Sequence, residues 1–275
     1  MTKEEYQTAW QAEMLTSRTG ATVGMLAKLK DSKYRDTYGL YLAEGVKLTE
    51  EALAAGVEID MVLVCTDGLD NERIVACVHD AHAKQIPIKL TTNEVFAKVS
   101  TEKAPQGILA VLKRKSHTGS ASTKTGRYFL LDTIQDPGNL GTILRSAVAF
   151  GVDGLILYGC ADPTGPKTVR AAMGALFRCP ITITDDLCRT IAELQQDGHR
   201  VLAAALGENS LTAGVAELRP NDCVVIGNEG HGVSPAAIEQ CDGVLRIPMQ
   251  AVTESLNASV AASVLLWEYY RTFGI

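Results

Sequence analysis

Short apolar runs without polar alternation recur in the second half of the chain and predict buried β-strands. The runs are Tyr128–Leu131, Gly154–Leu157, Val201–Leu206 and Val224–Ile226. Strands of a parallel sheet that is covered on both faces show this pattern, because neither face meets water. The intervening segments with helical spacing are 139–150, 168–177 and 187–196, and a long apolar helix over 257–273 ends the chain. We therefore expect an α/β domain with a parallel sheet.

The first half predicts a smaller α/β domain. Its expected helices are 44–55, which Gly56 stops, 71–84 and 92–99, and its expected strands are 59–65 and 107–112. A stretch rich in Ser, Thr, Gly and Lys, Lys113–Arg127, has the composition of a flexible linker. The expected boundaries are an extension over 1–23, a domain over 24–113, a linker over 114–126 and a second domain over 127–275.

Composition places the chain among ordinary globular proteins. Apolar residues make up 46% of its 275 residues and charged residues 21%, which excludes a disordered or collagen-like chain. The N-terminus has no apolar signal-peptide core, and no uncharged stretch approaches the length of a membrane helix. Seven scattered cysteines without a C-x-x-C pair suit a reducing cytoplasm and form no zinc motif.

The net charge of −6 argues against a nucleic-acid partner, but the basic residues gather in local clusters, which weakens that argument. Phosphate contacts depend on local potential rather than on whole-chain charge. Two basic clusters stand out, and their members are Arg18, Lys28, Lys30, Lys33 and Arg35 in the first, and Lys113, Arg114, Lys115, Lys124 and Arg127 in the second. A solvated surface has the same composition, so an RNA-binding role and a plain surface role both stay open.

Three segments of the second domain have unusual compositions. In Leu130–Val152, a polar loop with Pro137 and Gly138 enters a helix that carries Arg145. Backbone amides at a helix N-terminus bind anions, and an arginine two turns further along adds a positive charge. Asn139 at the start of the same helix is a candidate site residue, although it is equally suited to be an N-cap.

The second unusual segment is a glycine-rich turn, Val224–Pro235. Gly227, Gly230 and Gly232 follow an apolar strand and permit close approach of the backbone to a ligand. Their order, G-x-x-G-x-G, is neither the dinucleotide fingerprint nor the P-loop, which disfavours a Rossmann methyltransferase or dehydrogenase. His231 in this turn is more typical of a polar loop residue than of a catalyst.

The third segment is Leu245–Tyr270. It begins with the apolar run Ile247–Met249, whose central proline lacks a backbone donor. Ser255 and Asn257 then precede the long apolar helix, either as caps or as site residues.

Together these segments resemble the three motifs of the SpoU/TrmH family of RNA ribose 2′-O-methyltransferases, within the SPOUT class. The matching stretches are D-P-G-N-L-G-x-x-x-R-x-A, G-N-E-G-x-G and I-P-M-x-x-x-x-E-S-L-N-x-S-x-A. The first domain resembles the family's substrate-binding module of the ribosomal protein L30e type, through Ala43–Leu53 and Pro105–Lys113. The likeness extends from about Gly24 to the C-terminus.

The resemblance implies a fold, a cofactor and a site. It implies an α/β domain with a deep trefoil knot, a rare exception to the rule that chains do not thread loops. It implies S-adenosylmethionine as cofactor without a metal, bound by Gly227, Asn228, Gly230, Ile247, Met249 and Leu256. The implied catalytic residues are Arg145, Asn139, Glu229, Ser255 and Asn257.

The resemblance also assigns roles to these residues. A guanidinium loses its proton only with great difficulty, so we interpret Arg145 as the electrostatic partner of the developing alkoxide. Asn139 would position the ribose or phosphate, Glu229 and Asn257 would orient Arg145 or the substrate, and Ser255 would support the turn.

The implied substrate is RNA, namely 23S ribosomal RNA, and the implied assembly is a cytoplasmic homodimer. The long C-terminal helix is a candidate dimer contact, although burial within one chain explains its composition as well. Transfer RNA is the alternative substrate, and a non-catalytic knotted RNA-binding protein is the alternative function. The set of intact polar motif residues disfavours lost catalysis.

Overall fold

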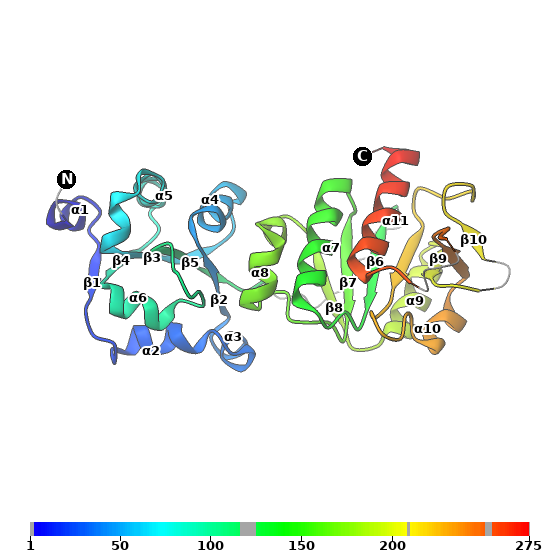
Figure 1. Ribbon diagram of the computed structural model, residues 1–275, viewed down its shortest axis with the longest axis horizontal. Helices are drawn as coiled ribbons and strands as arrows, with labels where there is room; N and C mark the ends of the chain where they lie inside the picture. Colours follow the sequence, from blue (N-terminus) through cyan, green and yellow to red (C-terminus); the bar gives the residue numbers. More distant parts are fainter. Residues whose placement is uncertain (1–2, 116–124, 208–209, 251–254, 275) are drawn as a thin grey trace. The chain divides into compact units, whose positions relative to one another are not determined.

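The computed structural model describes residues 3–115, 125–207, 210–250 and 255–274, which form two compact units (Figure 1). Unit 1 is formed by Met1–Lys115 together with Thr164–Phe177, and unit 2 by Ser116–Pro163 and Arg178–Ile275. Most of the predicted linker over 114–126 lies outside the described residues. None of the helices in the described ranges combines the length and the apolarity of a membrane span.

Unit 1 is a five-stranded mixed sheet with helices on both faces. The strand order is β1-β4-β3-β5-β2, in which β1, β4 and β3 run parallel and β5 is antiparallel to both β3 and β2. The strands are β1 (Glu13–Leu15), β2 (Leu40–Glu44), β3 (Ile59–Cys65), β4 (Ile88–Thr91) and β5 (Ile108–Lys113). The helices are α1 (Lys3–Ala9), α2 (Ala21–Lys28), α3 (Ser32–Tyr38), α4 (Val46–Ala55), α5 (Glu72–Ala83) and α6 (Asn93–Val99), and a 3₁₀ turn spans Thr66–Asp70.

Alternate residues of the central strand divide the core of unit 1 into two layers. Val62 and Val64 of β3 pack with α4 and α5, whereas Leu63 and Cys65 pack with α2 and α6. This division follows from the period of two in a strand, which sends successive side chains to opposite faces. The predicted elements from 44 to 113 are confirmed within a few residues at their ends, but the pattern missed α1, β1, α2, α3, β2 and β4.

Unit 2 is a seven-stranded sheet in which every neighbouring pair of strands is parallel, as the apolar runs predicted. The strand order is β10-β12-β9-β11-β6-β7-β8. The strands are β6 (Tyr128–Asp132), β7 (Gly154–Tyr158), β8 (Ile181–Thr184), β9 (Val201–Ala204), β10 (Leu211–Thr212), β11 (Cys223–Ile226) and β12 (Gly243–Arg246). The helices are α7 (Pro137–Phe150), α9 (Leu187–Gln196), α10 (Pro235–Gln240) and α11 (Ala258–Phe273).

Helices cover both faces of this sheet, which explains the absence of polar alternation in its strands. On one face, Tyr128 and Leu130 of β6 pack with α9 and α10. On the other face, Phe129 of β6 contacts Tyr269 of α11 edge-on, with ring centroids 6.2 Å apart. Helices α7 and α11 pack side by side on that second face (Figure 1). Every residue of β6 is buried as a result.

Residues Thr164–Phe177 come from the second half of the sequence but pack in unit 1. They form α8 (Pro166–Ala172) and a 3₁₀ turn (Ala175–Phe177), which contact β2 and α4. The pattern predicted one helix over 168–177, but Met173 takes a left-handed conformation with φ of 49° and ends α8. The trefoil knot stays a prediction.

Candidate active site

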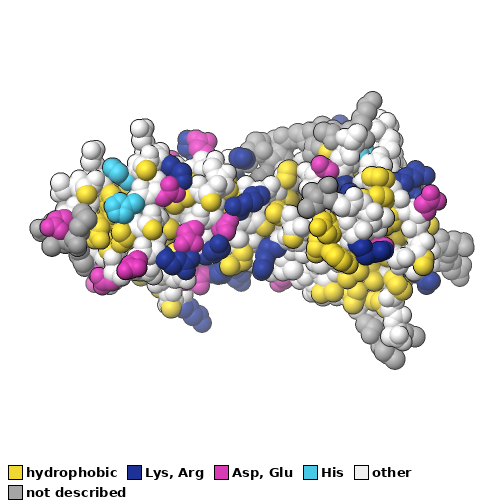
Figure 2. Space-filling view, turned by 90° about the horizontal axis from the view of Figure 1, so that it is seen from above, with side chains coloured by type: hydrophobic (Ala, Val, Ile, Leu, Met, Phe, Trp, Pro, Cys, Tyr) yellow, Lys and Arg dark blue, Asp and Glu magenta, His cyan; other side chains and the backbone are white. Residues whose placement is uncertain are grey.

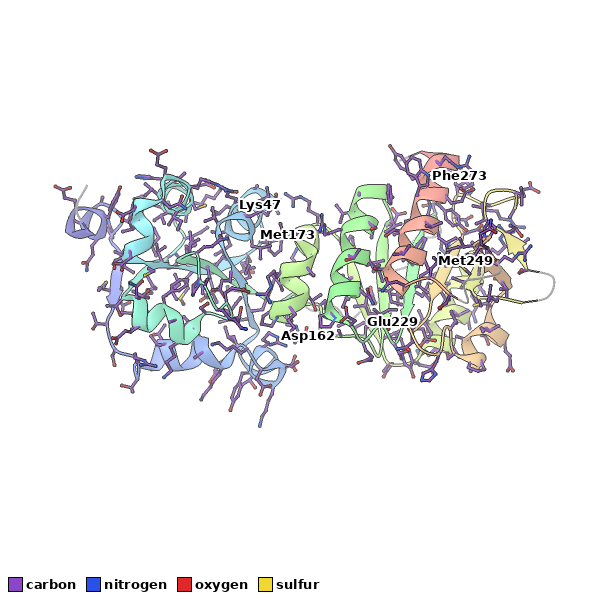
Figure 3. The ribbon with its side chains drawn as sticks, in the orientation of Figure 1. Lys47, Asp162, Met173, Glu229, Met249 and Phe273 are labelled. Atoms are coloured by element: carbon purple, nitrogen blue, oxygen red, sulfur yellow. The ribbon has the colours of Figure 1, made fainter. Side chains whose placement is uncertain are left out.

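The carboxyl ends of the parallel strands share one edge of unit 2, and the three motif segments meet at that edge. The first follows β6, the second follows β11, and the third joins β12 to α11. In open parallel sheets, ligands bind in the crevice outside these strand ends. Glu229 of the second segment and Met249 of the third both lie near the N-terminal end of α11 (Figure 3).

A cavity of about 420 Å³ lies between the second and third segments, entirely within unit 2. Its volume is in the range of pockets that bind small organic molecules and cofactors. The six predicted cofactor-binding residues all contribute to its wall, as do two predicted catalytic residues. These eight are Gly227, Asn228, Glu229, Gly230, Ile247, Met249, Ser255 and Leu256.

The cavity also has a wall that the motif analysis missed. Ala204, Ala205 and Leu206 line it, and they come from the end of β9 and the residues that follow it. These three residues could have been predicted from the topology of the sheet. Because β9 was predicted as a strand of the same parallel sheet, its carboxyl end is expected at the same edge. The side chain of Leu206 is 67% exposed, which leaves a large apolar group beside the cavity for a ligand to cover.

The glycine-rich turn closes on itself, and Gly227 is required for that closure. A Cβ atom on Gly227 would lie 2.0 Å from the backbone carbon of Gly232 and from the backbone nitrogen of Val233. Asn228 and Gly232 exchange two backbone hydrogen bonds across the turn, of 3.0 and 2.9 Å. The glycines were expected to let the backbone approach a ligand, whereas at Gly227 the close approach is made by the turn's own backbone.

Asn228 organises the turn from within. Its Oδ1 accepts a hydrogen bond from the backbone N–H of Gly230 at 2.8 Å, and its Nδ2 donates to the carbonyl oxygen of Thr133 at 2.8 Å. Both ends of the amide are therefore engaged by protein groups, and the turn is tied to the loop that follows β6. Asn228 contributes to the cavity by holding the backbone in place.

Asn139, Glu229 and Asn257 form one hydrogen-bonded chain beside the cavity. Asn139 Nδ2 donates to Glu229 Oε1 at 2.6 Å, and Asn257 Nδ2 donates to Asn139 Oδ1 at 3.1 Å. The carboxylate accepts only, so it orients the amide of Asn139, which in turn orients that of Asn257. The chain joins three segments that are separated by 90 and 118 positions in the sequence.

Helix caps hold this chain in place. Asp136 caps α7 by accepting a hydrogen bond from the backbone N–H of Asn139 at 2.8 Å, and Pro137 occupies the first turn. Asn257 caps α11, because its Oδ1 accepts from the N–H of Ser259 at 2.9 Å. Asn257 therefore caps α11 through its oxygen while its nitrogen donates to Asn139, and its role as a site residue stays a prediction.

Arg145 lies outside this chain. Its side chain is exposed, and it forms no hydrogen bond or ion pair with any residue that the structure describes. Six residues of α-helix rotate it about 120° away from Asn139. Ser146, one position further along, instead faces α11 and hydrogen-bonds Ser263 at 2.7 Å. Among the described residues, Arg145 thus lies on an exposed face of α7, away from the chain of Asn139, Glu229 and Asn257.

Buried groups at the same edge have structural roles. Asp132 is 1% exposed and accepts a hydrogen bond from the backbone N–H of Ser234 at 2.8 Å, which ties β6 to the start of α10.

Burial raises the pKa of Cys160 to about 11, so this thiol is protonated at neutral pH and is a poor nucleophile. The described residues contain no group of three or more His, Cys, Asp or Glu side chains placed to hold a metal ion.

The residues of the predicted basic clusters differ in their surroundings. Lys28, Lys30 and Lys33 are exposed on and between α2 and α3, and Lys115 is exposed after β5. Lys113 and Arg114 form ion pairs with Glu58 and Asp36, so their charges are partly neutralised. Lys124 lies outside the described residues. Arg127 is described in unit 2, where its Nε donates to the carbonyl oxygen of Pro220 at 3.0 Å.

Arg35 corrects the sequence prediction. Its side chain is 3% exposed, and Nη1 donates to the carbonyl oxygens of Leu29 and Lys30 at 2.8 and 2.9 Å. These carbonyls end α2, so the guanidinium caps one helix from the next and is covered in the process. The prediction that Arg35 contacts RNA phosphates is wrong, because a buried guanidinium that is engaged by backbone cannot reach them.

Replacing Asn257 with aspartate separates its two roles. The carboxylate keeps the cap on α11, so we expect a melting temperature within about 3 °C of the wild type. It removes the donor to Asn139, and we expect about a tenfold loss of catalytic rate. Thermal unfolding and single-turnover kinetics measure the two effects. Asn257→Ala is the matched control, since it loses both roles; a fully active Asn257→Asp variant would contradict the site role.

Comparison with known protein families gives two matches, which together span most of the chain. Residues 126–267 match the SpoU rRNA methylase family. Residues 21–110 match the MRM3-like substrate binding domain. The first match contains every motif residue discussed above, and the second contains the lysines of α2 and α3.

Two relatives are similar to this chain over nearly their whole length. A 23S rRNA (guanosine(2553)-2′-O)-methyltransferase of Bacillus subtilis, RlmP, is 34% identical over 87% of this chain and 92% of its own. A 23S rRNA (guanosine-2′-O-)-methyltransferase of Xanthomonas campestris, RlmB, is 32% identical over 80% and 93%. The crystal structure of an AdoMet-bound rRNA methyltransferase from Sinorhizobium meliloti superposes with a TM-score of 0.82 at 28% identity, covering 96% of this chain and 99% of that one.

Proposed function

Because the chain belongs to the SpoU rRNA methylase family, we propose that its cavity binds S-adenosylmethionine and that its motif residues methylate a ribose 2′-hydroxyl of 23S ribosomal RNA. The chain is an RNA 2′-O-methyltransferase, and S-adenosylmethionine is its methyl donor. The observation that carries the residue assignment is the Asn139–Glu229–Asn257 chain at the rim of the cavity. It brings one residue from each of the three motifs to one place.

The cavity suits the proposed cofactor in size and chemistry. Ile247, Met249 and Leu256 supply an apolar wall of the kind that an adenine ring packs against, and the turn after β11 exposes backbone groups to its polar parts. The methyl group of the cofactor is bonded to a sulfonium sulfur, which is itself the leaving group. No metal is therefore needed to activate the methyl donor. The protein must hold this group in line with the ribose and assist loss of the hydroxyl proton.

The motif residues act on the nucleophile. A ribose hydroxyl becomes negatively charged as it loses its proton during attack, and a fixed positive charge stabilises that change. We assign this role to Arg145, because its guanidinium stays protonated and donates in a planar fork that suits an alkoxide or a phosphate. Asn139 positions the ribose or its phosphate, and Glu229 holds the amide of Asn139 in a single orientation.

The position of Arg145 supports a homodimer as the working form. Val260, Val264 and Trp267 of α11 are 46, 36 and 48% exposed and, at spacings of four and three residues, share one helix face. Val148 of α7, one turn after Arg145, is 36% exposed. Hydrophobic side chains gather on the face of unit 2 seen in Figure 2. We propose that a second copy covers these side chains and receives Arg145 into its own site.

The substrate assignment predicts the loss of a methylation site in the cell. We expect a deletion strain to lack one or more 2′-O-methyl groups in 23S ribosomal RNA that the parent strain carries, and the purified enzyme to restore them with S-adenosylmethionine. Mapping of 2′-O-methyl sites in total RNA from both strains measures this. A strain that lost methyl groups from transfer RNA alone would overturn the ribosomal assignment and establish the alternative.

A further inference from the structure

Helix α3 in unit 1 is anchored in an unusual way. A short amphipathic helix ordinarily buries its aromatic side chains and exposes its arginines. In α3 the buried residue is Arg35, whose guanidinium hydrogen-bonds the end of α2, while Tyr34 is half-buried and Tyr38 is 40% exposed. The attachment of the helix therefore does not depend on Tyr38, whose ring stays accessible at this surface.

The two tyrosines form a nearly parallel aromatic pair. They are four residues apart on one face of α3, with ring centroids 6.2 Å apart and an angle of 16° between the ring planes. Lys28 of α2 places its Nζ atom over the ring of Tyr34, 5.2 Å from the centroid. A cation over one ring and an exposed neighbouring ring form the arrangement that proteins use to hold an unpaired base beside its phosphate.

Further cations come from α3, from α2 and the residues that flank it, and from α6, which packs against α2. Lys33 of α3 is exposed, and Lys30 bonds the carbonyl oxygen of Lys98, whose own Nζ atom bonds the carbonyl oxygen of Arg18. These bonds place the loop before α2, the end of α2 and the end of α6 in one continuous surface. The five cations are Arg18, Lys28, Lys30, Lys33 and Lys98.

The acidic residue of α3 and its acidic N-cap are both engaged. Asp31 caps α3 by accepting from the backbone N–H of Lys33, and Asp36 forms an ion pair with Arg114. The surface as a whole keeps an excess of positive charge in a chain whose net charge is −6. An anionic partner is therefore favoured at this site, while the rest of the chain repels one.

We propose that Tyr34 and Tyr38, with the surrounding lysines, form a stacking platform for an unpaired segment of the RNA substrate. Bases stack on the tyrosine rings, and the lysines contact the adjoining phosphates. The proposal rests on the function proposed above, and it names the structural class of RNA that unit 1 selects: a single-stranded loop or bulge. Base-paired RNA keeps its bases stacked inside the helix and offers none to these rings.

The test uses the full chain and a 23S ribosomal RNA transcript, with binding measured by filter retention at several salt concentrations. The variant Tyr34→Ala/Tyr38→Ala is expected to bind at least about fivefold and up to about a hundredfold more weakly, with an unchanged salt slope. Tyr34→Phe/Tyr38→Phe keeps both rings and is expected to bind within about twofold of the wild type. Thermal unfolding of both variants checks that unit 1 stays folded.

Loss of the lysines is expected to change the salt dependence of RNA binding, and a second pair of cations provides a matched control. Lys28→Gln/Lys33→Gln is expected to reduce the salt slope by about 1.4, since each contact with single-stranded RNA contributes about 0.7. Arg73→Gln/Lys84→Gln on α5 removes the same charge from cations that are paired with Glu50 and Asp80, and it should change the slope by less than half as much. Affinity for S-adenosylmethionine should be the same in all variants.

The possible outcomes distinguish failure of the stacking platform from failure of the proposed methyltransferase function. If the alanine pair binds the transcript as the wild type does, while the wild type methylates it, the platform is overturned and the function stands. If the wild type binds S-adenosylmethionine but neither binds nor methylates the transcript, both are overturned. An effect of the alanine pair that appears on ribosomal particles but not on the naked transcript would indicate a protein partner, which also overturns the platform.

Discussion

Replacing Arg145 with alanine is expected to lower the rate of methyl transfer by about 10²–10³, the size of the effect when one donor to a developing oxyanion is removed. Affinity for S-adenosylmethionine should be unchanged, because the side chain is exposed and does not line the cavity. Single-turnover transfer of labelled methyl to 23S ribosomal RNA measures the rate, and calorimetry measures the affinity. Arg145→Lys should recover only part of the rate, since a point charge does not reproduce the planar fork.

The same variant tests whether Arg145 acts on its own subunit or on its partner. An Arg145→Ala chain has an intact cavity, and a Gly227→Ala chain has an intact arginine. If the arginine acts across the interface, a heterodimer of the two contains one complete site and one doubly defective site. If it acts within its own chain, both sites are defective.

Heterodimers purified through two different affinity tags remove the uncertainty of mixing. Activity approaching half that of the wild-type dimer is expected. An inactive heterodimer would contradict sharing of the site and would return Arg145 to its own subunit.

Replacing Gly227 with alanine is expected to abolish binding of S-adenosylmethionine. The added Cβ would lie 2.0 Å from the backbone of Gly232 and Val233, a separation that no real structure tolerates, so the turn after β11 must move. That turn forms one wall of the cavity and holds Glu229 against Asn139. Calorimetry should find at least a hundredfold loss of affinity, together with a lower melting temperature because the paired turn is broken.

A neighbouring glycine is the matched control. A Cβ on Gly230 has Asn228 Oδ1 as its nearest neighbour at 3.4 Å, which is an ordinary contact with a side chain. Gly230→Ala adds the same methyl group to the same turn, so its affinity should stay within about tenfold of the wild type. Equal losses in the two variants would mean that an added methyl group anywhere in this turn prevents binding, and would contradict the explanation by the backbone clash specific to Gly227.

Much of the fold was predictable because it depends on local signals. Strand β3 was predicted at its observed bounds, and the apolar runs of β6, β7 and β11 correctly indicated a parallel sheet that is covered on both faces. The missed elements, such as β8 with its partly exposed Ile181–Thr184 and the two-residue β10, are short and lack a clean period. Their conformation depends on pairing with a neighbouring strand.

The members of the candidate site were proposed from the family resemblance, whereas their arrangement needed the structure. The resemblance missed Ala204, Ala205 and Leu206 in the cavity wall. It named eight of the other lining residues, and its candidates include Asn139, Glu229 and Asn257. It could not show that these three share one hydrogen-bonded chain, because segments about 90 and 118 positions apart meet only when the sheet and α11 are assembled.

The sequence by itself determined the longer strands and helices that have a clean hydrophobic pattern, and which polar residues follow those strands. Tertiary structure decided which way each side chain faces. It buried Arg35 under α2 and left Tyr38 outside, it turned Arg145 away from Asn139, and it placed α8 in unit 1. The physical reason is that period and capping act over a few residues, whereas burial depends on which surfaces the whole chain brings together.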